Sequence, residues 1–307
     1  MSFDWPDDSI FIAAPREMST NRFTQLVKRY LPKGDVVLGI ASEEYVVGFE
    51  GQPQFRMLKL ETVQPIIDKV ETSNSPNKIY PFEYAQADFD EIAQRLTSKQ
   101  RVLLVNGSWK YAFHNLVVYE TLVKNNVPFK FVSPFVDEVE VEAYELAHTP
   151  VIQLPENGEL LTQDAMFELA DRVATLSYDY SFQTGATLGR KHGDNYEFIM
   201  ATFNKVIPYQ TYALHHGNSR EKNRSRPHDI NHYDTIHAEM MALTEAIRRH
   251  EDIVGTTMFI QLLPCPTCAR TLSQTDISEI VYRHDHSDGY AVKLLEAAGK
   301  KVRRLVQ

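Results

Sequence analysis

Two short motifs in the C-terminal half indicate how that part of the chain folds: Thr235-Ile-His-Ala-Glu239 and Pro264-Cys-Pro-Thr-Cys268. The first opens residues 235–250, where apolar residues recur at helical spacing, and Asp234 or Thr235 is the expected N-cap. The second follows an apolar run at residues 257–263, which is typical of a buried strand, and the cysteines are expected to begin a helix. Each motif is therefore predicted to lie at a helix N-terminus.

Elements on both sides of these motifs predict a mixed sheet covered by helices. An amphipathic helix at residues 161–176 precedes two predicted strands, at residues 196–204 and 206–215. After the cysteines the pattern continues as strand, helix and strand, at residues 279–283, 290–298 and 301–305. The resulting β-β-α-β-α-β-α-β order predicts an α/β/α domain.

The N-terminal half alternates strands and helices. Residues 9–14, 21–30 and 35–40 follow each other as strand, helix and strand, and residues 101–135 form a strand–helix–strand pattern that predicts a parallel pair. Neither glycine-rich phosphate-binding pattern is present. We therefore predict a Rossmann-like parallel α/β domain, which is either a degenerate nucleotide-binding domain or a scaffold for oligomerisation.

An acidic stretch at residues 136–150 separates the two halves, so we predict domains at residues 1–145 and 150–307. The alternation of valine and glutamate within this stretch is also compatible with an edge strand. Trp109 and Tyr111 follow a predicted strand, and core packing is the expected role of both, ahead of lining a pocket.

Composition excludes several classes of protein. The 307 residues carry a net charge of −9, which argues against nucleic acid as a partner, because phosphate backbones are bound by basic surfaces. Only two cysteines occur, so a disulfide framework is excluded. No apolar run of ~18 residues and no signal-peptide pattern is present, so we expect a cytoplasmic protein without a membrane partner.

The two motifs together supply the donors of a metal site. His237, Cys265 and Cys268 are one nitrogen and two sulfur ligands, and three protein ligands with one open position are typical of catalytic zinc. Glu239 is then free to move protons. Two other interpretations remain open: a redox C-x-x-C pair, and a structural zinc with a fourth ligand from His215, His216 or His232.

The stretch from Tyr196 to Leu305 resembles the deoxycytidylate (dCMP) branch of the cytidine deaminase family, on the T-I-H-A-E and P-C-x-x-C motifs. The H-x-E and P-C-x-x-C pattern is the one given for zinc nucleobase deaminases in general. The resemblance implies hydrolytic deamination of a cytosine nucleotide, dCMP or a close relative, by a zinc enzyme. It also implies that Asn218, Ala238 and Pro264 contact the substrate. We also expect a homo-oligomer. The family pattern Gly-Tyr-Asn-Gly is replaced here by His216-Gly-Asn-Ser219.

A basic segment at residues 217–228 joins Asn218 to the first motif. It contains Arg220, Lys222, Arg224 and Arg226 against the single acid Glu221. Because arginine binds phosphate through two parallel hydrogen bonds, Arg220 and Arg224 are predicted to hold the phosphate of a nucleotide. The alternative is a solvated surface segment.

Other functions are compatible with the same candidate site residues. Nucleic acid or another small heterocycle, such as guanine or a riboflavin precursor, could be the substrate of the same zinc site. A zinc-containing nucleotide sensor is the non-enzyme alternative. Release of ammonia separates the enzymes from the sensor.

Overall fold

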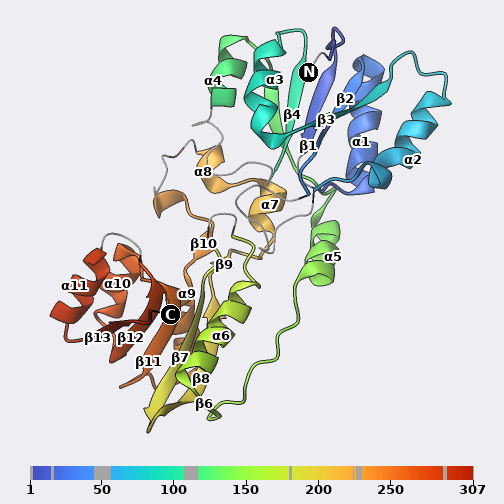
Figure 1. Cartoon of the computed structure of the whole chain (residues 1–307). Helices are drawn as coiled ribbons and strands as arrows, with labels where there is room; N and C mark the ends of the chain where they lie inside the picture. Colours follow the sequence, from blue (N-terminus) through green and yellow to red (C-terminus); the bar gives the residue numbers. More distant parts are fainter. Residues whose placement is uncertain are drawn as a thin grey trace. The chain divides into compact units, whose positions relative to one another are not determined.

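The computed structural model describes residues 3–14, 17–44, 57–106, 117–179, 182–223, 225, 230–285 and 289–306. The chain divides into two compact units (Figure 1). The first unit comprises residues 1–147 and 211–234, and the second comprises residues 148–210 and 235–307. One unit contains a parallel sheet and the other a mixed sheet, which confirms the predicted α/β fold class. Within the described residues, no helix is long and apolar enough to cross a membrane.

The first unit is built on a five-stranded sheet in the order β3-β2-β1-β4-β5. All four strand pairs are parallel, including the predicted pair β4–β5. Because β4 adds on the opposite side of β1 from β2, the order reverses between β1 and β4. The strands are β1 (Ile10–Ala14), β2 (Val36–Ala41), β3 (Ile79–Tyr84), β4 (Arg101–Val105) and β5 (Phe129–Val132).

Helices cover both faces of this sheet (Figure 1). α1 (Thr20–Tyr30) and α2 (Leu60–Glu71) pack on one face, and α3 (Phe89–Arg95) and α4 (Val117–Lys124) pack on the other. α1 forms because Phe23, Leu26, Val27 and Tyr30 recur at helical spacing and all are buried. Its N-cap is Ser19, whose hydroxyl accepts a hydrogen bond from the Arg22 amide. Trp109 and Tyr111 lie outside the described residues.

The acidic stretch is a helix, so the edge-strand interpretation is wrong. It forms α5 (Glu138–His148), in which Val141 is fully buried and Val139 is 73% exposed. A strand in this position would have put both valines on one face, whereas helical geometry separates residues two apart.

The second unit contains a six-stranded sheet in the order β13-β12-β11-β7-β8-β6. β11, β12 and β13 are parallel to one another, while β7 is antiparallel to both β11 and β8. Its strands are β6 (Leu160–Leu161), β7 (Gly185–His192), β8 (Asn195–Phe203), β11 (Thr257–Leu262), β12 (Glu279–His284) and β13 (Lys301–Arg304).

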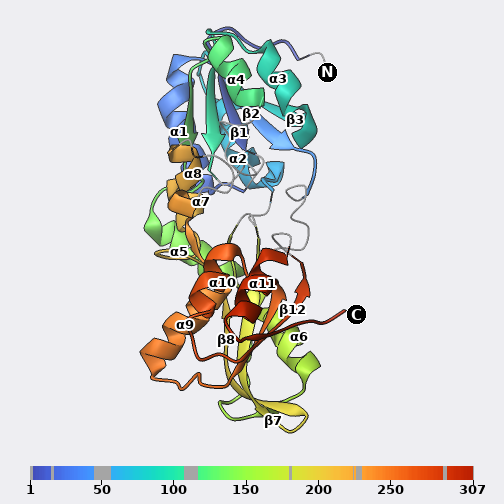
Figure 2. The same ribbon diagram turned by 90° about the vertical axis from the view of Figure 1, so that its left-hand side faces the viewer.

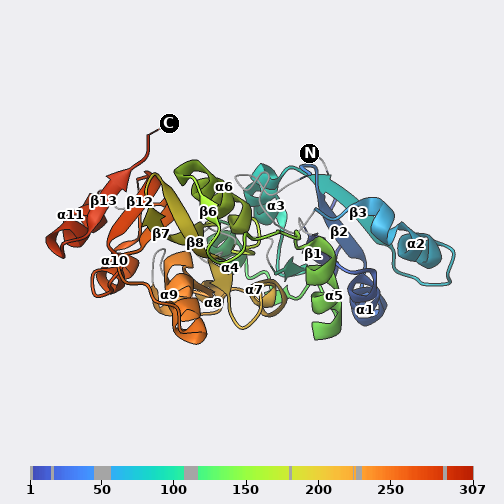
Figure 3. The same cartoon turned by 90° about the horizontal axis from the view of Figure 1, so that it is seen from below.

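Helices cover both faces here too. α6 (Gln163–Ala174) packs on one face, and α9 (Ala238–Arg249), α10 (Pro266–Leu272) and α11 (Tyr290–Ala297) pack on the other. Figures 2 and 3 show α9 and α10 on the opposite side of the strands from α6. The helix N-termini that carry the two motifs therefore start from the same face of one sheet.

Two predicted strand assignments change. The expected strand at residues 206–215 ends almost at once: β9 (Lys205–Val206) pairs with β10 (Thr235–Ile236), and α7 (Tyr212–His216) follows. Pro208 lacks the amide that a continuing ladder requires. The long strand that pairs with β8 is instead β7, which the sequence did not indicate because it contains glycines. Gly185 is required there because a Cβ atom would lie 1.9 Å from the carbonyl oxygen of Ala170.

Candidate functional site

His237 is fixed where a short strand changes into a helix. β10 pairs with β9, and Thr235 Oγ1 donates a hydrogen bond of 2.5 Å to Asp179. The chain then turns into α9 with His237 as its N-cap, in an extended conformation. This corrects the expected N-cap, which was Asp234 or Thr235. The shift matters because the imidazole then lies at the end of the helix axis, beside Glu239 in its first turn.

The cysteines are fixed in the same way by β11 and α10. Cys265 is the N-cap of α10, and Pro266 occupies its first helical position, where no amide is needed. The Cys268 amide nitrogen lies 3.5 Å from Cys265 Sγ. Both sulfurs therefore face the start of the helix, as the spacing predicted.

The structure brings the three predicted metal ligands together. Nδ1 of His237 lies 3.6 Å from Cys265 Sγ and 3.4 Å from Cys268 Sγ. The three donor atoms all lie within 4.8 Å of one another. Among the described residues no fourth donor joins this group, and His215, His216 and His232 belong to the other unit. One nitrogen and two sulfurs with an open position match a catalytic zinc site better than a structural one.

Contacts among the three donors shift the pKa of each of them. The hydrogen bond with Cys268 lowers the pKa of the Cys265 thiol, which favours its thiolate form. The same hydrogen bond and burial raise the pKa of Cys268. The hydrogen bond with Cys265 raises the pKa of His237 to about 8. Thiolate sulfur at a helix N-terminus is the form that binds metal.

Glu239 lies next to these donors and is almost completely buried, with 4% of its surface exposed. It forms a side-chain hydrogen bond with Cys268, and burial raises the pKa of its carboxyl. A carboxyl group with a raised pKa accepts a proton more readily than a solvated one. The geometry therefore suits Glu239 to proton transfer beside the three donors.

Two residues that are predicted to contact the substrate lie beside the metal donors in the sequence: Ala238 follows His237, and Pro264 precedes Cys265. Ala238 is fully buried, and its carbonyl oxygen accepts a hydrogen bond of 2.9 Å from Thr202 Oγ1. Pro264 is also buried, between β11 and Cys265.

The other predicted substrate contacts lie on the segment 211–234, in the first unit. Asn218 is buried, and its side-chain oxygen accepts a hydrogen bond of 2.9 Å from the Arg220 amide. Arg224 lies outside the described residues.

The Arg220 side chain has an unusual environment. Only 4% of its surface is exposed, and its guanidinium lies 4.1 Å from the centre of the Tyr233 ring. Nε and Nη2 of Arg220 have no hydrogen-bond partner within the described part of the chain. Burying a charged group without a partner costs free energy, which an anion would recover. Arg220 is thus a candidate contact for an anion.

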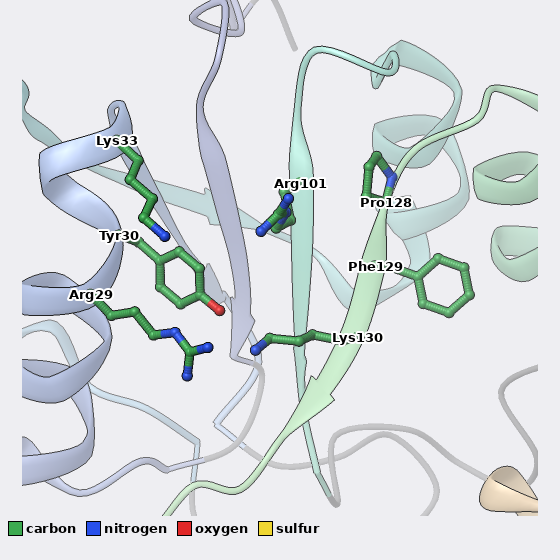
Figure 4. Close-up of a pocket in the computed structure, with 7 residues that line it drawn as sticks. All are labelled: Arg29, Tyr30, Lys33, Arg101, Pro128, Phe129 and Lys130. Atoms are coloured by element: carbon green, nitrogen blue, oxygen red, sulfur yellow. The ribbon is translucent and has the colours of Figure 1, made fainter.

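The sequence did not indicate a cavity that lies at the amino-terminal edge of the first unit's sheet, where β4 and β5 begin (Figure 4). The cavity has a volume of about 200 Å³. Among the described residues, four cationic side chains and no acidic one line it; the cations are Arg29, Lys33, Arg101 and Lys130. The ammonium group of Lys130 lies 5.5 Å from the centre of the Tyr30 ring. The cations come from α1, from the short helix after it, and from β4 and β5, so no local sequence pattern could have indicated the cluster.

Comparisons with known proteins agree with the motifs. Residues 162–284 match the family described as the cytidine and deoxycytidylate deaminase zinc-binding region. An uncharacterised deaminase of Aliivibrio fischeri is 30% identical over 114 residues, which cover 37% of this chain and 67% of that protein. Deoxycytidylate deaminase of Enterobacteria phage T4 is 37% identical over 62 residues, which cover 20% of this chain.

The chain spans about a third of the length of the phage relatives that it matches. Among solved structures, the dCMP deaminase of cyanophage S-TIM5 in complex with dCMP and dUMP is 21% identical. That match covers 47% of this chain and 96% of the cyanophage chain, with a TM-score of 0.37.

Proposed function

Because the chain belongs to the cytidine and deoxycytidylate deaminase family, we propose that it is a zinc-dependent hydrolase that deaminates a cytosine nucleotide, dCMP or a close relative. The products are the uracil nucleotide and ammonia. One observation carries the proposal: a buried carboxyl group, Glu239, lies beside three metal donors that meet at two helix N-termini.

Zinc fits the donor set. His237, Cys265 and Cys268 would hold the ion, since imidazole nitrogen and thiolate sulfur are the ligands that zinc prefers. When bound, zinc supplies a water molecule that loses its proton near neutral pH. Both helix N-termini point their amide groups toward the donors, and this favours the negative charge that thiolate ligands carry.

Glu239 moves the protons of the reaction. Water adds to C4 of the cytosine ring, and Glu239 takes a proton from that water. The carboxyl group gives this proton to N3 of the ring, then takes the remaining proton from the new C4 hydroxyl and gives it to the amino group as its bond to C4 breaks, so that ammonia leaves and the ring keeps a carbonyl oxygen at C4. Burial supports this role, because it excludes solvent and raises the pKa of Glu239. At neutral pH the protonated and ionised forms of the carboxyl group are therefore closer in free energy than those of a solvated glutamate.

The residues that the sequence predicts as substrate contacts are proposed to recognise the nucleotide. Ala238 and Pro264 flank the metal donors and are proposed to contact the base, and Asn218 the nucleoside. Arg220 and Arg224 are proposed to bind the phosphate. Nε and Nη2 of Arg220, which are buried and have no hydrogen-bond partner among the described residues, support the phosphate contact, because charge-assisted hydrogen bonds to phosphate would satisfy them.

The test is ammonia release by the purified full chain with cytidine, CMP, dCMP, dCTP, guanine and single-stranded DNA. We expect release from dCMP or a closely related cytosine nucleotide, at least a thousandfold slower in Glu239→Gln, which keeps its zinc. Glu245→Gln, on the same helix but paired with Arg248 and Arg249, is the matched control and should retain activity. A zinc-loaded protein that releases no ammonia from any of these compounds would favour a nucleotide sensor.

A further inference from the structure

A second cluster of metal-ligand side chains lies in the first unit. His215 and His216 are the last two residues of α7, and Glu138 is the first residue of α5. Glu138 Oε1 lies 3.8 Å from His215 Nε2 and 3.6 Å from His216 Nε2. One ligand atom from each residue falls within 4.8 Å of the other two.

The position of His215 is set by its surroundings. The residue is 8% exposed, and its Nδ1 lies 2.6 Å from Ser133 Oγ. This hydrogen bond fixes the ring so that the other nitrogen, Nε2, faces Glu138. Metal-binding histidines are usually oriented in this way, through a hydrogen bond from the ring nitrogen that does not bind the metal.

The cluster also lies where open α/β sheets bind ligands. Ser133 follows β5, and Asn106 follows β4 and donates a hydrogen bond of 2.8 Å from Nδ2 to the carbonyl oxygen of His215. Both residues are at the carboxyl ends of their strands, and the strand order reverses next to β4. The carboxyl edge near such a reversal is the general ligand-binding position of this architecture.

We propose that Glu138, His215 and His216 bind a divalent transition-metal ion of the zinc class in the first unit. Two imidazole nitrogens and one carboxylate oxygen are a common ligand set for such ions and leave positions open for water. The ion would link α5 to α7 and so fix the segment that continues to Asn218. The alternative is a set of surface ion pairs between histidine and Glu138, whose side chain is 60% exposed.

The test counts zinc in the full chain after removal of metal, addition of excess Zn²⁺ and dialysis. The wild type should hold two zinc ions per chain, and Glu138→Gln and His216→Gln should hold one. Glu142→Gln is the matched control, since this exposed glutamate is on the same helix, and it should hold two. Ser133→Ala should weaken the second ion about 10–100-fold, because it frees the ring of His215.

Cobalt separates this site from the cysteine cluster. In a protein with both Cys265→Ser and Cys268→Ser, Co²⁺ should still bind once per chain, without thiolate-to-metal charge-transfer absorption. Adding Glu138→Gln should abolish that binding. Equal zinc content in the wild type and Glu138→Gln would overturn the proposal. A single zinc that only the cysteine substitutions remove would overturn it as well, while leaving the proposed deaminase intact. A single zinc that only Glu138→Gln removes would support it and count against zinc at the cysteines.

Discussion

Nδ1 of His237 lies 3.4 Å from Sγ of Cys268, a residue 31 positions further along the chain. The contact joins the N-termini of α9 and α10, which pack on the same face of the mixed sheet. His237 and Cys265 are themselves the N-caps of these helices. The metal donors thus take positions that side chains with hydrogen-bonding atoms commonly fill, and metal binding and helix starts depend on the same residues.

Replacing Cys265 by alanine should remove the metal from this cluster and destabilise the second unit. A ligand that binds only the folded state stabilises it by about 2.7 kcal/mol when its free concentration is a hundred times its Kd. We expect a lower midpoint of thermal unfolding for the second unit in Cys265→Ala, and no further loss for that unit when chelator is added. Metal analysis and thermal unfolding with and without chelator check this. Thr267→Ala, at the exposed position between the cysteines, should behave as the wild type. An unchanged midpoint together with zinc-free wild type would refute a metal site here.

The metal donors could be predicted because each motif is local. His237 and Glu239 lie within one helix start, and Cys265 and Cys268 within another, so residue type and helical spacing were enough. The apolar periodicity of α1 and α6 likewise predicted helices close to their observed bounds. That the two helix starts meet follows from neither motif alone, because it depends on the order of strands in the sheet, and it was predicted only from the joint H-x-E and P-C-x-x-C pattern.

Other features depend on contacts that no local pattern carries. β7 is a central strand, yet Gly185 and Gly189 replace the apolar residues that would have indicated it. The glycines reflect the close approach of α6 and β8, which is visible only in the folded chain. The cationic cavity and the Glu138 cluster combine residues from separate elements in the same way.

Replacing Arg220 by alanine should weaken binding of a nucleotide more than binding of the matching nucleoside. Its buried Nε and Nη2 have no hydrogen-bond partner in the described ranges and could donate to phosphate, and a lost charge-assisted hydrogen bond costs about 1.5–3 kcal/mol, or roughly 10–150-fold in KM. Steady-state kinetics with both substrates measure the difference. Lys222→Ala, at an exposed position two residues on, is the control and should change KM little. Equal losses for nucleotide and nucleoside would indicate a structural role for Arg220.

Replacing Lys33 by glutamine should slightly stabilise the protein at low ionic strength. Lys33 lines the cationic cavity with Arg29, Arg101 and Lys130, and no acidic side chain from the described part of the chain lines it. Like charges repel, and salt screens exposed charges, so the gain should be on the order of 1 °C in the midpoint and should vanish in high salt. Thermal unfolding at two salt concentrations checks this, with Lys28→Gln, an exposed α1 residue that does not line the cavity, as control. A loss of stability that is independent of salt would contradict the charge argument.

Replacing Glu279 by glutamine should destabilise the second unit at neutral pH and much less in acid. Glu279 begins β12 and is 5% exposed, and its Oε1 lies 3.1 Å from both Lys301 Nζ and Arg303 Nε on β13. Burial alone raises the pKa of Glu279, but hydrogen bonds from Lys301 and Arg303 outweigh it and hold the pKa below its usual value. A depressed pKa in the folded state contributes stability that is complete above the unfolded value of about 4.3 and is lost as the pH falls through the folded value.

The expected difference in unfolding free energy between Glu279→Gln and wild type at pH 7 is about 1.5 kcal/mol. This is the low end for hydrogen bonds to a charged group, because the Lys301 side chain is 64% exposed and solvent screens it. Urea unfolding at pH 7 and below pH 4 measures the difference, which should shrink in acid as the wild-type carboxylate becomes protonated. Glu296→Gln, at an exposed position on α11, should differ little from wild type at either pH. A difference that is the same at both pH values would show that shape, and not charge, makes Glu279 stabilising, since glutamine keeps the size of glutamate but cannot ionise.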